Sequence, residues 1–180
     1  RTSLSFRKRM AKQNFKLTSD YDLSIFKWLN KKKGGKIKLK YGENPNQKAY
    51  FIKDSNSHIF DSQLAGKKIG YNNVLDISDG LKCLNDFTVP TCVIIKHNNP
   101  CGLASANNIT NAYIKALESD PKSAFGGVVL LNRQINIKLA ETINKKFFEV
   151  IVSPNINKKT LEVLKYKKKL IIISSENLRY

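Results

Sequence analysis

The chain has 180 residues, of which 41% are hydrophobic, and this length suits one ordinary domain or one domain with an appendage. No window approaches the roughly 18 consecutive apolar residues of a transmembrane helix, so the sequence excludes a membrane-spanning helix. The formal net charge of +18 at pH 7 points to an anionic partner or substrate.

The first 36 residues predict a helical segment followed by a linker. Apolar side chains recur at helical spacing over residues 4–30, and Ser19 or Asp20 is a candidate N-cap for a second helix running through Trp28. The polar, glycine-bearing run 31–36 interrupts this pattern and is the best candidate linker. We therefore expect a boundary near residue 35, with a helical segment over 1–35 and the main domain over 36–180.

The remaining sequence alternates strand-like and helix-like segments. We expect strands over 37–41, 49–52, 91–95, 128–131, 150–153 and 170–173, and helices over 74–87, 110–119, 137–147 and 158–165. Strands that alternate with helices predict an α/β fold whose sheet is covered on both faces and is at least partly parallel.

The ends of the chain and its cysteines bear on where the protein works. The N-terminus is basic, lacks the apolar core of a signal peptide and does not begin with Met, so we expect a cytoplasmic chain cut from a longer one. Cys83, Cys92 and Cys101 form no CxxC pair, and His58 and His97 are the only histidines. This pattern argues against structural zinc and a disulfide scaffold and favours a reducing compartment.

The positive charge is unevenly distributed. Residues 1–40 hold 13 Lys and Arg against Asp20 and Asp22, and a second basic cluster lies over 158–169. Net charge alone affects solubility and the electrostatic attraction of charged molecules, and it does not identify a specific partner. We therefore expect no nucleic-acid role, although a basic module that binds RNA or another polyanion remains the alternative.

Four polar loops lie beside predicted strand or helix ends, at 40–47, 70–73, 96–102 and 123–127. They supply a histidine, lysines, a glutamate, tyrosines and carboxamides, with glycines that allow a ligand to approach the backbone closely. No GxGxxG or GxxxxGK[ST] motif occurs, which argues against dinucleotide and P-loop sites. The clustering of polar groups at element ends predicts a ligand site at the sheet edge.

The loop 96–102 is the most informative, because a buried strand there ends in Lys96 and His97. An imidazole shuttles protons near neutral pH, and a neighbouring cation helps to keep it neutral. Adjacent side chains of a regular strand point to opposite faces, so joint action requires the strand to end or bulge here. We expect Asn98, Asn99 and Pro100 to form that turn. The alternative is a histidine that satisfies strand-end carbonyls beside a solvated lysine.

Other loop residues have both functional and structural interpretations. Cys101 follows a proline as in the Pro-Cys-x-x-Cys motif of zinc deaminases, but Ala104 stands where the second cysteine is required, so we expect a small buried residue. Gly126 and Gly127 form either a tight turn or an anion-binding backbone, with Phe125 available to pack on an aromatic ring. Lys40 beside Tyr41 is either a phosphate-binding cation or a plain surface lysine.

The four loops together resemble a known family. The runs LKYGENPNQ (39–47), YNNxLD (71–76), IKHNNPCG (95–102) and SDPxSAFGG (119–127) resemble, in the same order, the AICAR transformylase/IMP cyclohydrolase family of bifunctional purine biosynthesis enzymes. The resemblance covers most of residues 37–175. Residues 10–25 look like the end of that family's N-terminal cyclohydrolase domain.

The resemblance implies transfer of a formyl group from 10-formyltetrahydrofolate to the 5-amino group of AICAR in IMP synthesis. It implies a three-layer α-β-α fold, like cytidine deaminase but without zinc, of which 36–180 is the first of two related halves. Residues 1–35 would then be the helical tail of the cyclohydrolase domain. The family also implies a homodimer with active sites at its interface, AICAR and folate as partners, and IMP cyclohydrolase activity in the full-length protein.

The resemblance also implies roles for individual residues. His97 would be the base or proton shuttle, and Lys96 the cation that supports the formyl oxygen. The substrate-binding residues would be Lys40, Tyr41, Asn72, Asn73, Phe125, Gly126 and Glu149. Lys40 stands where the family has arginine, so a bidentate fork becomes a point charge. A further alternative is a fragment that keeps the motifs but has no turnover alone.

Overall fold

The computed structural model describes residues 2–29, 36–52 and 59–176, and its contacts divide the chain into two compact units, 1–35 and 36–180. The division falls where the sequence predicts a boundary. Most of the linker run lies outside the described residues. Membership of residues 1–35 in an upstream domain stays a prediction.

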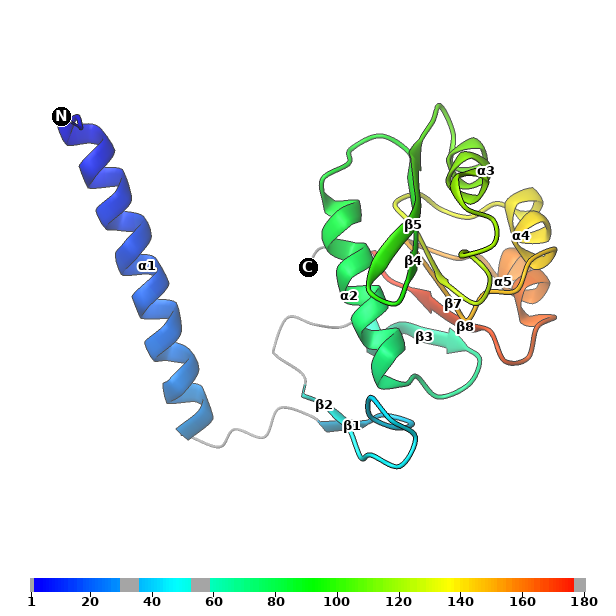
Figure 1. Cartoon of the computed structure of the whole chain (residues 1–180), viewed down its shortest axis with the longest axis horizontal. Helices are drawn as coiled ribbons and strands as arrows, with labels where there is room; N and C mark the ends of the chain where they lie inside the picture. The colour runs from blue at the N-terminus through cyan, green and yellow to red at the C-terminus, as the bar shows by residue number, and fades with distance from the viewer. Residues whose placement is uncertain (1, 30–35, 53–58, 177–180) are drawn as a thin grey trace. The chain divides into compact units, whose positions relative to one another are not determined.

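The first unit consists of one helix, α1 (Leu4–Leu29), shown in blue in Figure 1. The expected second helix start at Ser19 or Asp20 is wrong, because the hydroxyl of Ser24 donates to the Asp20 carbonyl at 2.7 Å, within an unbroken helix. Its large apolar side chains are exposed, with Phe15 at 71% and Trp28 at 76% of full exposure. Within this unit, therefore, the apolar residues build no core.

The second unit contains the sheet and its helices. In chain order its elements are β1 (Lys36–Lys38), β2 (Tyr50–Ile52), the 3-10 helix η1 (Ile59–Ser62), β3 (Gln63–Ala65), α2 (Tyr71–Asn85), β4 (Thr91–Lys96), β5 (Asn99–Ser105), α3 (Ile109–Ser119), β6 (Val128–Leu131), α4 (Ile137–Asn144), β7 (Val150–Ser153), α5 (Lys158–Lys165) and β8 (Ile171–Ser174). β1 and β2 form an antiparallel pair of their own. The other six strands form one sheet in the order β3-β8-β7-β6-β4-β5.

That sheet is mixed. β6, β7 and β8 are parallel, whereas β4 runs antiparallel to both β6 and β5, and β3 runs antiparallel to β8. β4, β6 and β7 are almost completely buried, as expected for strands covered on both faces. The prediction of an α/β fold with a partly parallel, covered sheet is confirmed.

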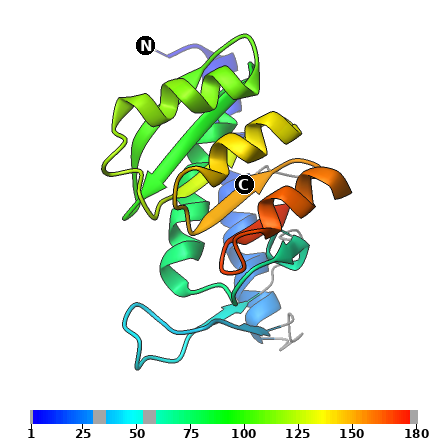
Figure 2. The ribbon, with the colours of Figure 1, turned by 90° about the vertical axis from the view of Figure 1, so that its right-hand side faces the viewer.

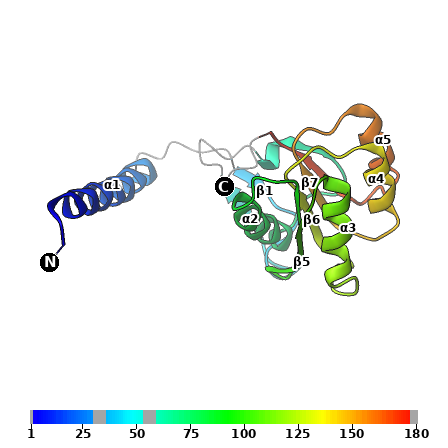
Figure 3. The same ribbon diagram turned by 90° about the horizontal axis from the view of Figure 1, so that it is seen from above.

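In the central strands, alternate side chains pack into two hydrophobic cores, one on each face of the sheet. In β4, Cys92 and Ile94 join the core under α3, α4 and α5, whereas Val93 and Ile95 join the core under α2. Figure 3 shows α2 on one side of the sheet and α3, α4 and α5 on the other, and Figure 2 looks onto the face that carries the latter three. The second unit thus has three layers, and burial of period-two hydrophobic faces holds them together.

Some element bounds differ from those predicted. α2 begins at Tyr71 instead of residue 74, so Asn72 and Asn73 lie in its first turn and not in a preceding loop. β3, η1 and β5 were not predicted, because they are short or interrupted by polar residues, Pro100 and Gly102. In the described part of the chain, no helix is both long and apolar enough to cross a membrane.

Candidate active site at the end of the β4–β5 hairpin

The Lys96–His97 pair lies at a two-residue hairpin turn. β4 ends at Lys96, which pairs with Asn99 at the start of β5, and the turn residues His97 and Asn98 have φ values of 52° and 63°. Positive φ at both central residues is the geometry that matches the twist of antiparallel strands. The prediction of a turn over Asn98, Asn99 and Pro100 is right for Asn98 and wrong for Asn99 and Pro100, which lie in β5.

Pro100 is tolerated within β5 for two reasons. β5 is an edge strand of the sheet, and its pairing with β4 shifts register beside Pro100. A proline that lacks an N–H fits such a position. The turn itself lies before Pro100, at His97 and Asn98.

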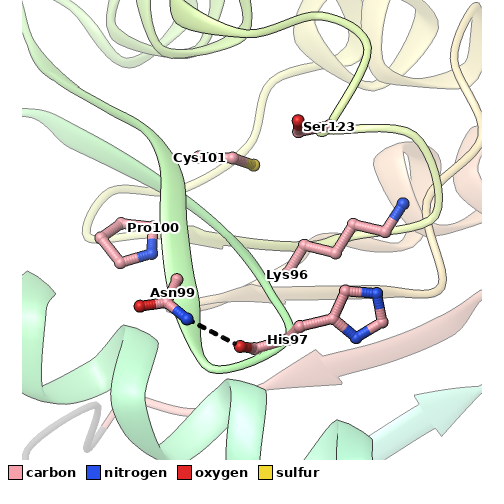
Figure 4. A pocket seen from close by; sticks show the side chains of 6 residues that line it. All are labelled: Lys96, His97, Asn99, Pro100, Cys101 and Ser123. Atoms are coloured by element: carbon pink, nitrogen blue, oxygen red, sulfur yellow. Dashed lines mark hydrogen bonds between the residues drawn. The ribbon is translucent and has the colours of Figure 1, made fainter.

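The turn brings Lys96 and His97 together. Their side chains project to the same side of the hairpin, whereas Pro100 projects to the other (Figure 4). This is the departure from strand alternation that joint action of the two residues requires. The ammonium of Lys96 donates to the carbonyl of Phe125 at 2.5 Å, which fixes its direction across the sheet edge.

A cleft of about 300 Å³ opens on the α2 side of this pair. It is lined by Tyr41, Asn72, Asn73, Asp76, Lys96, His97, Phe125, Gly126, Phe147 and Glu149. These residues come from five separate parts of the chain. Every predicted site residue except Lys40 lines this one cleft.

Glu149 is the charged centre of the cleft floor. Its Oε2 accepts hydrogen bonds from Lys67 Nζ at 3.0 Å and from Asn73 Nδ2 at 3.2 Å. Partial burial acts to raise the pKa of Glu149, but the hydrogen bonds from Lys67 and Asn73, with the charges of Lys67 and Lys40, outweigh it and lower this pKa. Glu149 is therefore ionised at neutral pH.

Lys67 is a contributor that the sequence analysis missed. It lies in the turn before α2, and its side chain is 28% exposed in the ion pair with Glu149. Its neighbour Lys68 is exposed and has the same local sequence character. Only the tertiary structure distinguishes the two lysines.

Backbone pairing places Lys40 and Tyr41 at the cleft. The N–H of Lys40 donates to the Ile69 carbonyl at 2.9 Å, and the Tyr41 carbonyl accepts from the N–H of Tyr71 at 3.3 Å. The Lys40 ammonium lies 5.3 Å from the centroid of the Tyr41 ring, within cation–π range. Lys40 does not line the cleft, but its charge acts on Glu149.

Phe125 and Phe147 form an aromatic pair that lines the α2-side cleft. The rings of Phe125 and Phe147 have centroids 5.1 Å apart, and both side chains are largely exposed, at 60% and 43%. Gly126 adopts φ +74°, a conformation that favours glycine, and its N–H donates to the Phe147 carbonyl at 2.8 Å. Phe147 was not predicted, since nothing in its local sequence separates it from the buried Phe148.

A second cleft, of about 370 Å³, lies on the other side of the pair and is drawn in Figure 4. Lys96 and His97 line it together with Asn99, Pro100, Cys101 and Ser123. Burial raises the pKa of the Cys101 thiol, so the thiol stays protonated at neutral pH. Cys101 is half-buried, whereas the sequence analysis expected a buried residue, and its structural role stays a prediction.

Two carboxylates of α2 face the turn. Asp76 Oδ1 accepts the N–H of Asn98 at 2.8 Å, and Asp79 Oδ2 accepts Nδ2 of Asn98 at 2.9 Å. Burial raises the pKa of Asp76, and the negative charges of Asp79 and Glu149 raise it further. The hydrogen bond from Asn98 and the charge of His97 act to lower this pKa but do not outweigh burial. The hydrogen bonds from Asn98 and Lys82 lower the pKa of Asp79. The described residues include no group of three or more His, Cys, Asp or Glu side chains arranged to hold a metal ion.

The fold and the cleft define an α/β protein whose candidate site gathers a lysine–histidine pair, carboxamides, a paired glutamate and aromatic rings at one sheet edge. The family model described as "AICARFT/IMPCHase bienzyme" matches residues 1–180. The chain belongs to this family, and the resemblance found in the four loops is confirmed.

Similarity to individual proteins supports this family membership. The chain is 39% identical to the bifunctional purine biosynthesis protein PurH of Acetivibrio thermocellus over 98% of this chain and 38% of that protein. It is 43% identical to PurH of Bacteroides thetaiotaomicron over 96% of this chain and 35% of that protein. The chain thus spans little more than a third of the length of these relatives.

Among solved structures, RibD of Acinetobacter baumannii, form 1, aligns with 59% of this chain and 36% of its own, at 14% identity and a TM-score of 0.45. A match at this level carries no argument about function.

Proposed function

We propose that residues 36–180 form the first half of an AICAR transformylase domain and supply a pair of reactive side chains, Lys96 and His97. The reaction transfers a formyl group from 10-formyltetrahydrofolate to the 5-amino group of AICAR. The observation that supports this most is the convergence of eight predicted residues on one cleft around the pair. Membership of the bienzyme family supplies the reaction class.

His97 is proposed to remove the proton that the amine must lose. The lone pair of this amine is delocalised into the imidazole ring and carboxamide, so the amine attacks well only if its proton leaves as the C–N bond forms. His97 accepts that proton while the amine nitrogen bonds to the formyl carbon. The bond from that carbon to the folate nitrogen then breaks, and the folate nitrogen takes up a proton.

Lys96 is proposed to stabilise negative charge on the formyl oxygen during this exchange. Its ammonium has three donors, and the carbonyl of Phe125 occupies one of them at 2.5 Å. The remaining donors are free to hydrogen-bond a developing oxyanion.

The rest of the cleft is proposed to bind the two substrates. Lys40 and Tyr41 help to hold the nucleotide, with Lys40 acting as a point charge in place of the family arginine. Asn72 and Asn73 contact AICAR, and Glu149 is the acidic pocket residue. Phe125 and Gly126 form the folate-side wall, where an exposed ring suits a planar ligand.

The larger assembly also belongs to this proposal. Residues 1–35 are the tail of the upstream cyclohydrolase domain, and a second deaminase-like, zinc-free half completes the transformylase domain. The full-length protein is a cytoplasmic homodimer with its active sites at the interface and also has IMP cyclohydrolase activity. The many exposed apolar side chains of α1 are consistent with burial against parts of the protein outside this chain.

Steady-state formyl transfer by the full-length protein that carries this sequence tests the proposal. AICAR and 10-formyltetrahydrofolate are supplied, and formation of tetrahydrofolate is followed. We expect turnover by the wild type and a fall of about 10²- to 10⁴-fold in kcat for His97→Ala, the range typical of a general base. Lys115→Met, an exposed change on α3, is the control and should leave kcat unchanged. Full activity in His97→Ala would overturn the assignment.

A further inference from the structure

We propose that Asp76 and Asp79 are positioning residues that hold the His97–Asn98 turn against α2 and thereby fix the imidazole beside the Lys96 ammonium. This inference rests on the proposed function and deepens it, because it assigns a part of the machinery outside the lysine–histidine pair. Neither carboxylate is required to touch a substrate for this role.

The turn needs external support because of its backbone. His97 and Asn98 both adopt positive φ, at 52° and 63°. For residues other than glycine this left-handed conformation is sterically unfavourable, although asparagine tolerates it better than most. Because β5 is an edge strand, the sheet holds the turn from the β4 side only. An unsupported turn would relax and move His97 away from Lys96.

The two carboxylates supply that support at two different atoms of Asn98. Asp76 accepts the backbone N–H at 2.8 Å, and Asp79 accepts the side-chain amide at 2.9 Å. The carboxamide of Asn99 completes the turn by donating to the His97 carbonyl at 3.0 Å. Charged acceptors make hydrogen bonds roughly twice as strong as neutral ones.

The helix geometry allows both contacts at once. Asp76 and Asp79 are three residues apart on α2 and so face the same way. The next residue, Gly80, lies so close to the sheet that an added Cβ would come within 2.3 Å of the Leu130 side chain. This close approach brings α2 within reach of the hairpin end. A 2.9 Å ion pair with Lys82 holds the Asp79 carboxylate in place.

Asp76 and Asp79, which together clamp the His97–Asn98 turn and are called the clamp below, have a position that predicts the kinetic effect of removing them. Misplacement of a reacting group by about 1 Å can cost on the order of 10²-fold in rate. Asp76 also lines the cleft, but the substrate contacts proposed above are those of other residues. The loss should therefore fall mainly on kcat while KM for both substrates changes little. Asp76, whose partner is the backbone of the turn itself, should matter more than Asp79.

Kinetics of the full-length protein provide the test. We expect Asp76→Ala to lower kcat about 10- to 100-fold with KM within about threefold, since positioning sets the rate. Asp76→Asn keeps an oxygen that accepts the Asn98 N–H and should recover most of kcat. An Asp76→Asn variant as impaired as Asp76→Ala would show that the carboxylate charge acts in the chemistry, and would overturn the positioning role. An unchanged kcat in Asp76→Ala would also overturn it. Asp86→Ala, an exposed change at the end of α2, is the control.

A double-mutant cycle covers the case in which Asp76→Ala fails to fold. Asn98→Gly keeps positive φ and the backbone N–H but removes the carboxamide that Asp79 binds. The losses in kcat of Asp79→Ala and Asn98→Gly should therefore be strongly non-additive, because both remove the same contact. Additive losses would contradict the clamp.

The amide resonance of Asn98 separates failure of this inference from failure of the proposed function. In ¹H–¹⁵N spectra of the wild type we expect a downfield Asn98 proton, which moves upfield in Asp76→Ala but not in Asp86→Ala. If the wild type transfers no formyl group, the proposed function is wrong, and this resonance alone decides whether the clamp exists. An Asn98 proton unaffected by Asp76→Ala would overturn the clamp whatever the activity.

Discussion

Lys96 and His97 line two clefts whose chemistry differs. The cleft on the α2 side is lined by Glu149, which Lys67 holds at 3.0 Å, by Asp76, by carboxamides and by exposed phenylalanine rings. The cleft on the other side is lined by Asn99, Pro100, Cys101 and Ser123, and the Ser123 hydroxyl donates to the Asp120 carboxylate at 2.6 Å. Lys96 and His97 thus lie between two clefts that differ in their lining. The other residues proposed to bind substrate, apart from Lys40, line only the α2-side cleft.

A large effect, second only to loss of His97, is expected from another change shared by both clefts. Lys96→Met removes the proposed donor to the formyl oxygen and should lower kcat about 10²- to 10³-fold, as loss of one oxyanion donor does. Steady-state formyl transfer by the full-length protein measures it, and Lys115→Met is the matched control. If Lys96→Met mainly raised KM and left kcat intact, Lys96 would be a binding residue only.

A smaller effect is expected on the α2 side alone. Lys67→Met removes the charged hydrogen bond to Glu149, worth about 1.5 kcal/mol or roughly tenfold, and should raise KM for AICAR without changing KM for the folate. Lys68→Met, its exposed neighbour, should leave both constants unchanged. Equal changes in the two KM values would show that the Lys67–Glu149 pair does not act on the AICAR side of the cleft alone.

The same ion pair predicts a pH dependence of stability. The pKa of Glu149 lies below its ordinary value of 4.5 in the folded protein. Its stabilising contribution is therefore fully present above this ordinary value and is lost as the pH falls through the lower folded value. Urea unfolding of the wild type and Glu149→Gln should show a difference in stability that shrinks on acidification. A difference that grows at acid pH would contradict the lowered pKa.

The smallest effect is expected on the other side. Cys101→Ala should change kcat by less than about threefold, because a thiol whose pKa is raised by burial is a poor nucleophile. The same steady-state assay measures it. A loss comparable to that of Lys96→Met would reverse the assignment and make Cys101 a reactive group.

The sequence predicted the central strands well because their hydrophobic runs are unambiguous. The runs at 91–95, 128–131 and 150–153 became β4, β6 and β7 almost residue for residue. It failed at β5, since Pro100 and Gly102 are typical of turns and only an edge position with a register shift accommodates them. It also placed the start of α2 too late, because Asn72 and Asn73 have weak intrinsic helix preference.

The candidate site was predictable only in part. The four loop motifs contain most of the residues that line the α2-side cleft, whereas Glu149 was expected only from the family resemblance. Lys67 and Phe147 were missed because their roles depend on tertiary neighbours, Glu149 and Phe125. Asp76 and Asp79 act on a turn about twenty residues further along the chain, and no local pattern links a helix face to that turn.

Single-turnover formyl transfer by His97→Asn in the full-length protein tests the central claim most directly. Asparagine tolerates the positive φ of residue 97, so the turn should persist while the base is lost. We predict that AICAR and 10-formyltetrahydrofolate bind with Kd values within about threefold of wild type, and that the transfer step slows by about 10²- to 10⁴-fold. Wild-type transfer rates in His97→Asn would contradict the account.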